Sequence, residues 1–146
     1  MLKVTHLNVN YGESHVIRDI SFDVNEGETV AIMGRNGMGK TTLFKSLIGI
    51  IPAKSGSILM NGAELSSAKS FERVAKGMAY VPQGRMVFPY LTVEENIRTG
   101  MEAAPNADIP EYIYGTFPVL KEMKDRKGGN LSGGQQQQLV IARALV

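Results

Sequence analysis

Residues 34–41 read Gly34-Arg35-Asn36-Gly37-Met38-Gly39-Lys40-Thr41 and match the pattern G-x-x-x-x-G-K-[ST] at every specified position. A short apolar run precedes this segment, and apolar residues recur at helical spacing after it. Glycines let a backbone wrap a phosphate with its N–H groups inward, and the following helix adds its positive dipole. Lys40 supplies a positive charge for the β- and γ-phosphates, and the Thr41 hydroxyl suits Mg²⁺. The alternative is a plain glycine turn between a strand and a helix.

The chain around this segment alternates between strand and helix patterns. Polar–apolar alternation predicts strands over residues 2–10, with one uncertain register step, and over residues 17–24. Short apolar runs predict buried parallel strands over residues 29–33 and 78–81. A further strand, residues 56–60, ends in a tight Asn61-Gly62 turn, and helices are expected within residues 43–51, 70–76, 109–127 and 135–146. A strand, a glycine loop, a helix and another strand in this order indicate an α/β core.

Composition excludes several classes of protein. The 146 residues include 43% hydrophobic and 21% charged residues, as in a folded globular domain. The net charge of +2 is too small to indicate a nucleic-acid partner. The absence of cysteine excludes disulfides and cysteine nucleophiles, and two histidines are too few for a histidine-rich metal site. Without an apolar segment of membrane-spanning length or a signal peptide, the chain is expected to start in the cytoplasm.

A second glycine cluster narrows the function. Residues 131–135 read Leu131-Ser132-Gly133-Gly134-Gln135 and open a helical pattern. A serine hydroxyl and two glycine amides at a helix N-terminus form an anion site, although a simple Ser-Gly-Gly cap would read the same. Together the two clusters resemble the motifs of ATP-binding cassette (ABC) ATPases, and the resemblance covers all 146 residues. It implies that residues 131–135, the signature segment, meet the γ-phosphate held by a second copy, so that two ATP molecules are sandwiched in a head-to-tail dimer.

The resemblance assigns further residues one by one. Tyr11 matches the aromatic residue that stacks on adenine, and Val16 matches a branched residue at the nucleotide. An ordinary strand-end tyrosine and a core valine are the alternatives. Gln83 matches a glutamine that reaches Mg²⁺ and the attacking water and relays to membrane subunits; a plain loop glutamine is its alternative. The expected metal ligands are Thr41 and Gln83, and the expected ATP-binding residues are Tyr11, Val16, residues 34–41 and Thr42. Arg35 stands where many relatives carry proline or serine.

The resemblance also implies the fold, the partners and the location. The fold is an α/β P-loop NTPase of the ABC ATPase type, with antiparallel β-strands, a parallel core sheet and a helical subdomain. Residues 1–91 form the nucleotide-binding core and residues 92–146 the helical subdomain. Residues 80–96 look like those of ATPase subunits of bacterial branched-chain amino acid or urea importers, with urea preferred. Such a subunit pairs with a second ATPase, docks on membrane permeases at the inner face of the plasma membrane, and indirectly serves a periplasmic binding protein.

Two family features are not found in residues 1–146. No run of four apolar residues is followed by Asp-Glu, the pair that supports Mg²⁺ and polarises the attacking water, and no later histidine matches a γ-phosphate contact. The C-terminal part of the core is therefore expected to be missing, with slow or no ATP hydrolysis. We also expect an unpaired apolar sheet edge at residues 29–33 and low solubility. The alternatives are a catalytically silent nucleotide-binding fragment and a soluble ABC ATPase of DNA repair or translation.

Overall fold

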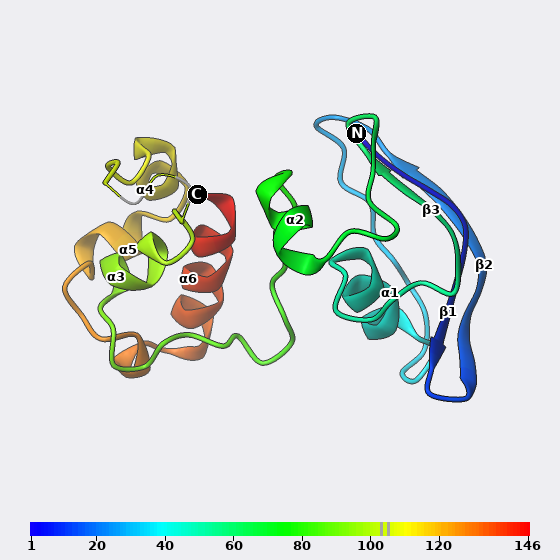
Figure 1. Ribbon diagram of the computed structural model, residues 1–146. Coiled ribbons are helices and arrows are strands. Elements are labelled where there is room, and N and C mark those ends of the chain that lie inside the picture. The colour runs from blue at the N-terminus through cyan, green and yellow to red at the C-terminus, as the bar shows by residue number, and fades with distance from the viewer. Residues whose placement is uncertain (103, 105) are drawn as a thin grey trace. The chain divides into compact units, whose positions relative to one another are not determined.

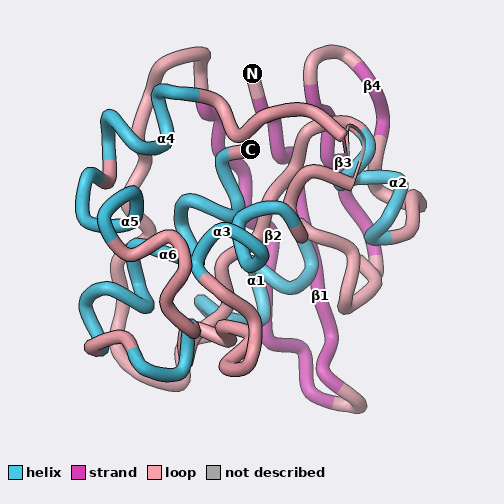
Figure 2. Tube along the Cα trace, turned by 90° about the vertical axis from the view of Figure 1, so that its left-hand side faces the viewer, coloured by secondary structure: helices cyan, strands magenta, loops and turns pink. Residues whose placement is uncertain are grey.

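The structure is a computed structural model that describes residues 1–102, 104 and 106–146. The chain forms two compact units, Met1–Met78 (unit 1) and Ala79–Val146 (unit 2). Unit 1 contains the strands and the first helices, whereas unit 2 is helical in its described residues (Figures 1 and 2).

Unit 1 is built on an antiparallel sheet with the strand order β2-β1-β3-β4. The strands are β1 (Leu2–Tyr11), β2 (Ser14–Val24), β3 (Ser55–Met60) and β4 (Ala63–Glu64). The Asn61-Gly62 turn joins β3 to β4, and both residues have positive φ (50° and 82°), as a two-residue hairpin of type I′ requires. The strands expected over residues 2–10, 17–24 and 56–60 are thereby confirmed.

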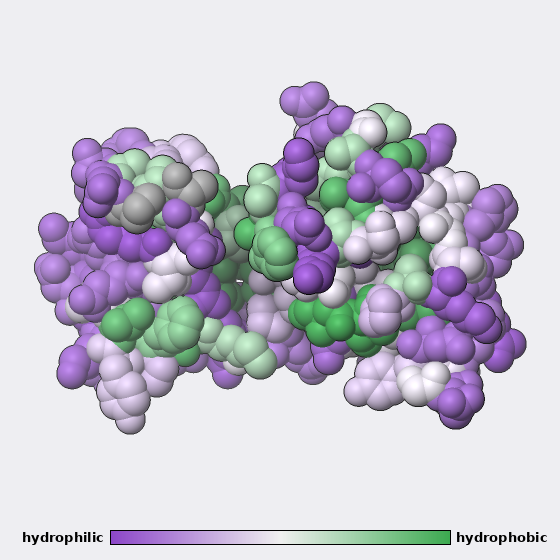
Figure 3. Space-filling view, in the orientation of Figure 1, coloured by the Kyte–Doolittle hydropathy of each residue, from purple (hydrophilic) through white to green (hydrophobic). Residues whose placement is uncertain are grey.

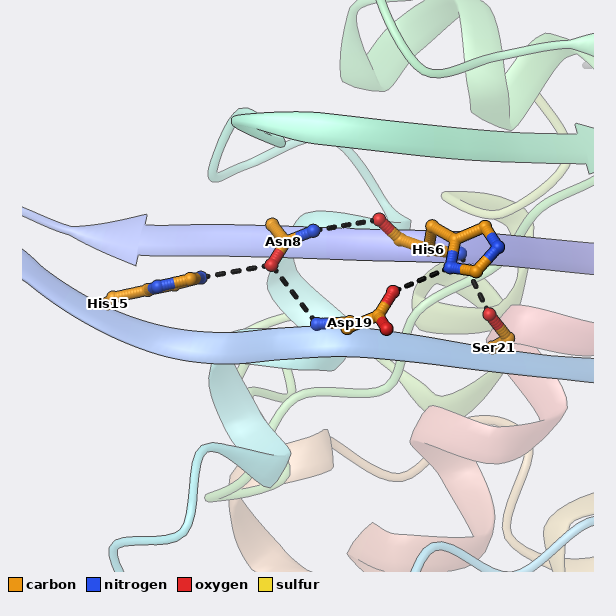
Figure 4. A network of polar contacts seen from close by, with 5 residues as sticks. All are labelled: His6, Asn8, His15, Asp19 and Ser21. Carbon is orange, nitrogen blue, oxygen red and sulfur yellow. Dashed lines mark hydrogen bonds and ion pairs between the residues drawn. The ribbon is translucent and has the colours of Figure 1, made fainter.

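The register of β1 against β2 shifts at three places, where one step was expected, and the first of these shifts is a bulge at His6. The pairing changes between Val4↔Phe22 and Leu7↔Ile20, so Val4 and Leu7 both stay buried although they are three positions apart. His6 and Asp19 have φ of 49° and 51°. Side chains replace the lost ladder bonds: the His6 N–H donates to Ser21 Oγ at 2.8 Å, and His6 Nδ1 lies 2.6 Å from Asp19 Oδ1 (Figure 4).

One helix of unit 1 packs on this sheet. Helix α1 (Lys40–Leu47) lies against β1 and β2 and buries Leu43 and Leu47. Helix α2 (Ser70–Ala75) follows β4 and confirms the helix expected over residues 70–76. The core of the unit consists of Val4, Leu7, Val9, Ile17, Leu43, Leu47, Ile58 and Leu65. Because α1 begins at Lys40, within residues 34–41, this core also holds that glycine-rich segment in place.

In its described residues, unit 2 packs four helices and a short 3-10 turn. These are α3 (Val93–Arg98), α4 (Glu111–Thr116), α5 (Pro118–Glu122), η1 (Gly128–Asn130) and α6 (Gly133–Leu145). Their core consists of Val93, Ile97, Met101, Ile109, Ile113, Leu120, Leu131, Leu139 and Ala142. The chain after α3 passes so close to α6 that a Cβ on Gly100 would overlap the carbonyl oxygen of Arg143. No helix of the described residues is both long and apolar enough to span a bilayer.

The two expected parallel strands, residues 29–33 and 78–81, are wrong as secondary structure. Both segments lack strand assignment, and every strand pair in the described residues is antiparallel. A strand exists only through hydrogen bonds to a neighbour, and neither segment has one there. The sheet edge expected at residues 29–33 is therefore an exposed irregular segment, in which Val30 is 39% and Met33 89% exposed. Apolar side chains reach the surface of both units (Figure 3).

Candidate phosphate-binding site

The backbone of the phosphate loop, residues 34–41, depends on two glycines. Gly37 and Gly39 have φ of 83° and 91°, a left-handed conformation that residues with a Cβ adopt at a cost. Gly39 is also enclosed, because an added Cβ would lie 2.8 Å from Val16 Cγ1 and 2.9 Å from Ile17 Cδ1. At Gly37 an added Cβ would meet no heavy atom within 4 Å. Position 39 therefore requires glycine for both space and backbone angle, and position 37 for backbone angle alone.

The N-terminus of α1 carries no cap from a side chain. Gly39 is the N-cap residue, no side-chain hydrogen bond caps the helix, and its first turn holds no acidic residue. The first N–H groups of a helix lack acceptors within the helix, and the helix dipole gives this end a partial positive charge. The amides of Lys40, Thr41 and Thr42 thus form a donor set suited to an anion such as phosphate.

Lys40 adds a full positive charge to the same place. Its Nζ donates to the carbonyl oxygens of Gly34 at 2.5 Å and Arg35 at 2.8 Å, so the side chain folds back over the loop. Within the described part of the chain, no ion pair includes Lys40. A phosphate oxygen is a stronger acceptor for an ammonium group than a neutral carbonyl oxygen. A phosphate at this loop would therefore offer the Lys40 ammonium group a stronger partner than these two carbonyls.

The opposite end of α1 is held by Arg73, a residue for which the sequence pattern offered no signal. Arg73 is 1% exposed, and its Nη1 donates to Ser46 O at 2.8 Å and Leu47 O at 2.7 Å. Its Nε also donates to Ala68 O at 2.9 Å. Burial lowers the pKa of Arg73, and the negative charge of Glu64 opposes this. Because a cation at a helix C-terminus satisfies the last carbonyls and complements the dipole, Arg73 anchors the helix that carries the loop.

Two further expected residues lie in unit 1. Val16 is half-buried and packs against Gly39, so the structure brings it to the phosphate loop. Tyr11, at the end of β1, is 63% exposed, as an aromatic platform for a base must be. Thr41 is exposed at the second position of α1. The roles of Tyr11, Val16 and Thr41 at the nucleotide stay predictions.

The signature segment, residues 131–135, lies in unit 2 and caps its own helix. Ser132 is the N-cap of α6: its Oγ accepts from Gln135 N at 3.4 Å, and its own N–H donates to Gln135 Oε1 at 2.9 Å. Leu131, 7% exposed, anchors the segment in the core of the unit. The first turn of α6 holds no acidic residue, so its positive end also remains uncompensated. Gln83 is exposed in the same unit.

Comparison with known proteins gives the family context. The sequence model of one family, described as ABC transporter, matches residues 17–146. A probable branched-chain amino acid transport ATP-binding protein, LivF of Archaeoglobus fulgidus, is 38% identical over 149 residues, which cover 100% of this chain and 63% of the relative. The high-affinity branched-chain amino acid transport ATP-binding protein BraG of Pseudomonas aeruginosa is 40% identical, with 100% and 64% coverage. The chain thus spans less than two thirds of both relatives.

Solved structures share the fold. A bacterial ABC transporter cassette, MJ0796, determined as a dimer, superposes with a TM-score of 0.80 at 25% identity and covers 99% of this chain and 69% of its own. The same cassette with ADP and Pi bound superposes with a TM-score of 0.77 at 26% identity, with the same coverage. An ATP-binding subunit of an ABC transporter superposes at 0.78 with 29% identity, covering 98% of this chain and 60% of that structure.

Proposed function

Because the chain belongs to the ABC transporter family and has the α/β P-loop fold of its ATPases, we propose that it binds ATP through residues 34–41 as the ATP-binding subunit of a bacterial importer. The observation that carries this proposal is the uncapped N-terminus of α1 beside the Lys40 ammonium group. Three amides, a helix dipole and a cation point to an anion with several oxygens, as in a triphosphate.

The residues present fit a nucleotide with Mg²⁺. The Thr41 hydroxyl is exposed beside the donor set and offers the hard oxygen that Mg²⁺ prefers. In the proposal Thr41 and Gln83 hold the ion, which would offset the charge of the phosphates when bound. Lys40 and the loop amides bind the β- and γ-phosphates, Tyr11 stacks on the adenine, and Val16 packs beside the nucleotide. Residues 131–135 contact the γ-phosphate held by a second copy.

The proposed cargo is branched-chain amino acids. Support comes from the two relatives described above, which are named for that transport and are aligned over this whole chain. Neither of these relatives is named for urea, so the preference for urea in the sequence analysis has no support from them. Uptake of labelled leucine and labelled urea by cells with and without the gene separates the two cargoes. Loss of leucine uptake alone is expected, and loss of urea uptake alone would contradict the proposed cargo.

The proposal extends to assembly and organisation. A second ATPase subunit completes the site, permease subunits receive the motion at the inner face of the plasma membrane, and a periplasmic binding protein delivers the cargo. The division into a nucleotide-binding core, residues 1–91, and a helical subdomain, residues 92–146, stays part of the proposal. No role for nucleic acid is proposed.

Calorimetric titration tests the site directly. Mg²⁺-ATP and Mg²⁺-ADP are expected to bind, whereas AMP, which lacks the β- and γ-phosphates that Lys40 and the loop contact, is expected to bind at least ~100-fold more weakly. Residues 1–146 are expected to hydrolyse bound ATP very slowly, because this sequence holds no Asp-Glu pair after an apolar strand. Equal affinity for AMP and ATP would overturn the assignment of residues 34–41 as the phosphate site.

A further inference from the structure

The backbone that follows Gln83 is strained. Gly84, Arg85 and Met86 have φ of 92°, 69° and 49°, so three consecutive residues lie in the left-handed region. The Met86 N–H donates to Gly84 O at 2.8 Å and closes a tight turn. Residues other than glycine persist in this region only where surrounding contacts hold them, and such strain collects at functional sites. Residues 84–91, here called the 84–91 loop, must therefore be held in this conformation by contacts with the surrounding helices.

One set of contacts comes from Arg143 on α6. Its Nη2 donates to Met86 O at 3.0 Å, and its guanidinium carbon lies 5.2 Å from the centre of the Phe88 ring. The first contact holds the carbonyl of a strained residue, and the second is a cation–π interaction. Burial lowers the pKa of Arg143, and no carboxylate pairs with it among the described ion pairs. Arg143 thus directs its hydrogen bond and its cation–π contact at the 84–91 loop.

A second set of contacts comes from Asn96 on α3. Asn96 is fully buried, its Oδ1 accepts from Phe88 N at 2.8 Å, and its Nδ2 donates to Phe88 O at 3.0 Å. The same Nδ2 also lies 3.2 Å from Leu91 O and 2.8 Å from Thr92 O. One side chain thereby satisfies both backbone groups of Phe88, as a neighbouring strand would. Since α3 packs on α6, the two sets of contacts belong to one structure.

The loop also reaches the signature segment itself. The guanidinium group of Arg85 occupies the space that a Cβ on Gly133 would need, directly after Ser132. The 84–91 loop therefore contacts both ends of α6. Arg85 lies against Gly133, the first residue of the helix, and Met86 and Phe88 contact Arg143 in its last turn. In Figure 1 this segment runs past the first turn of α6 on its way to α3. Gln83 is the residue immediately before this loop.

We propose that Arg143 and Asn96 are positioning residues that fix Gln83 and the signature segment in one rigid body. The proposal rests on the proposed function, which gives Gln83 and residues 131–135 their roles at the nucleotide. The 84–91 loop is short and is fixed to both the first and the last turn of α6. In the proposal it therefore moves together with α6 and does not bend when Gln83 is displaced. A shift of Gln83 on nucleotide binding then moves Ser132 with it.

Distance measurement between spin labels tests this coupling, and the absence of cysteine allows clean labelling. Labels at Met86→Cys and Gln137→Cys, both exposed residues, report on the 84–91 loop and on α6. Pulsed electron resonance is expected to give one narrow distance, unchanged by Mg²⁺-ATP. Arg143→Met is expected to broaden the distribution at least about twofold, and Arg143→Lys, which still donates to Met86 O, to restore part of the narrow component.

Arg98→Met is the matched control. Arg98 pairs with Glu94 at 3.0 Å on α3 and contacts Ala107 O, without a bond to the 84–91 loop, so the same substitution there is expected to leave the distance narrow. The proposal is overturned if the distribution is already broad in the parent chain, if Arg143→Met leaves it narrow, or if Arg98→Met broadens it equally. Separation of the labels on adding Mg²⁺-ATP would also overturn it.

A second measurement covers Asn96, whose substitution risks unfolding the unit. Exchange of the Phe88 amide hydrogen is expected to be at least ~10-fold faster in Asn96→Asp and in Arg143→Met, while amides of α6 keep their protection. Unchanged Phe88 exchange in Asn96→Asp would contradict the role of Asn96. ATP affinity of Arg143→Met is expected to stay within about twofold of the parent. Absence of ATP binding in the parent chain would instead overturn the proposed function, since the label distances and the amide exchange require no nucleotide.

Discussion

The phosphate loop, residues 34–41, and the signature segment, residues 131–135, both place glycines at the start of an amphipathic helix. They differ in whether a side chain caps that helix. Helix α1 begins at a left-handed Gly39 with no side-chain cap, and within the described residues Lys40 Nζ donates to two neutral carbonyls and to no carboxylate. Helix α6 begins at Ser132, and Ser132 and Gln135 satisfy each other's backbone amides.

The difference separates two ways of preparing an anion site. Around α1 the donors are fixed by the fold and remain without strong acceptors, so the site gains free energy only when an anion arrives. Around α6 the amides of Ser132 and Gln135 already have side-chain acceptors, so a ligand that binds the Gln135 amide has to replace the Ser132 hydroxyl.

The largest effect is expected for Lys40→Ala, which removes the cation from the uncapped helix. ATP affinity should fall at least ~100-fold, about 3 kcal/mol, because a charge-assisted contact to phosphate is lost. The free energy of unfolding should change little, since the hydrogen bonds of Lys40 Nζ in the described residues go to two loop carbonyls. Lys45→Ala on the same helix is the control and should retain ATP affinity in a calorimetric titration. Unchanged affinity in Lys40→Ala would remove the distinction between the two helix starts.

Gly39→Ala is expected to have the next largest effect, now on stability. The added methyl group meets Val16 and Ile17 and sits at a φ of 91°, so unit 1 should lose about 2–3 kcal/mol in its free energy of unfolding. Gly37→Ala shares the left-handed φ without the contacts and should lose only about 1 kcal/mol. Urea unfolding followed by circular dichroism compares the two variants. Equal losses would show that the enclosure of Gly39 is not important.

Ser132→Ala tests the self-satisfied helix start. Loss of an N-cap hydroxyl typically reduces stability by about 1 kcal/mol, and unit 2 should respond by that amount. Ser132→Asn retains a capping oxygen and should stay within a few tenths of a kcal/mol of the parent chain. Thr92→Ala, which removes the equivalent capping box of α3, provides the matched comparison in urea unfolding. If Ser132→Ala leaves the free energy of unfolding unchanged, the Ser132 hydroxyl does not cap α6, and the two helix N-termini do not differ in this respect.

Gly134→Ala is expected to have the smallest effect and the opposite sign to Gly39→Ala. Gly134 has no positive φ, lies inside α6, and an added Cβ meets nothing within 4 Å. Alanine has the higher helix propensity, so unit 2 should gain about 0.5 kcal/mol in thermal or urea unfolding. A clear loss of stability would show that the signature glycine is required by the fold and not by a ligand.

Short sequence patterns predicted the helix starts and the tight turn, because these features depend on a few adjacent residues. The glycine spacing of residues 34–41 identified the start of α1, and Ser132 identified the start of α6. The Asn61-Gly62 pair identified the tight turn after β3, because that turn needs two positive φ angles. Residues 29–33 and 78–81 were predicted as strands from apolar content alone. That prediction was wrong because a strand needs a neighbour that sequence content does not supply.

Other features have no local signature at all. Arg73 is one arginine in a six-residue helix, and only the fold brings its guanidinium group to the last carbonyls of α1. Arg85 and Met86 carry no pattern that indicates left-handed backbone, and Asn96 is one polar residue in a helical run. Their roles come from partners far away along the chain or on other elements.

The sequence alone predicted where a phosphate binds in this protein, because glycine spacing, a lysine and a hydroxyl are typical of an anion loop formed by the backbone of a few adjacent residues. The tertiary structure alone decided which of the two glycine clusters is uncapped and what holds each in place. Those properties depend on Val16 against Gly39, on Arg73 at the far end of α1, and on Arg143 across the 84–91 loop. Each is a contact between residues that only packing brings together.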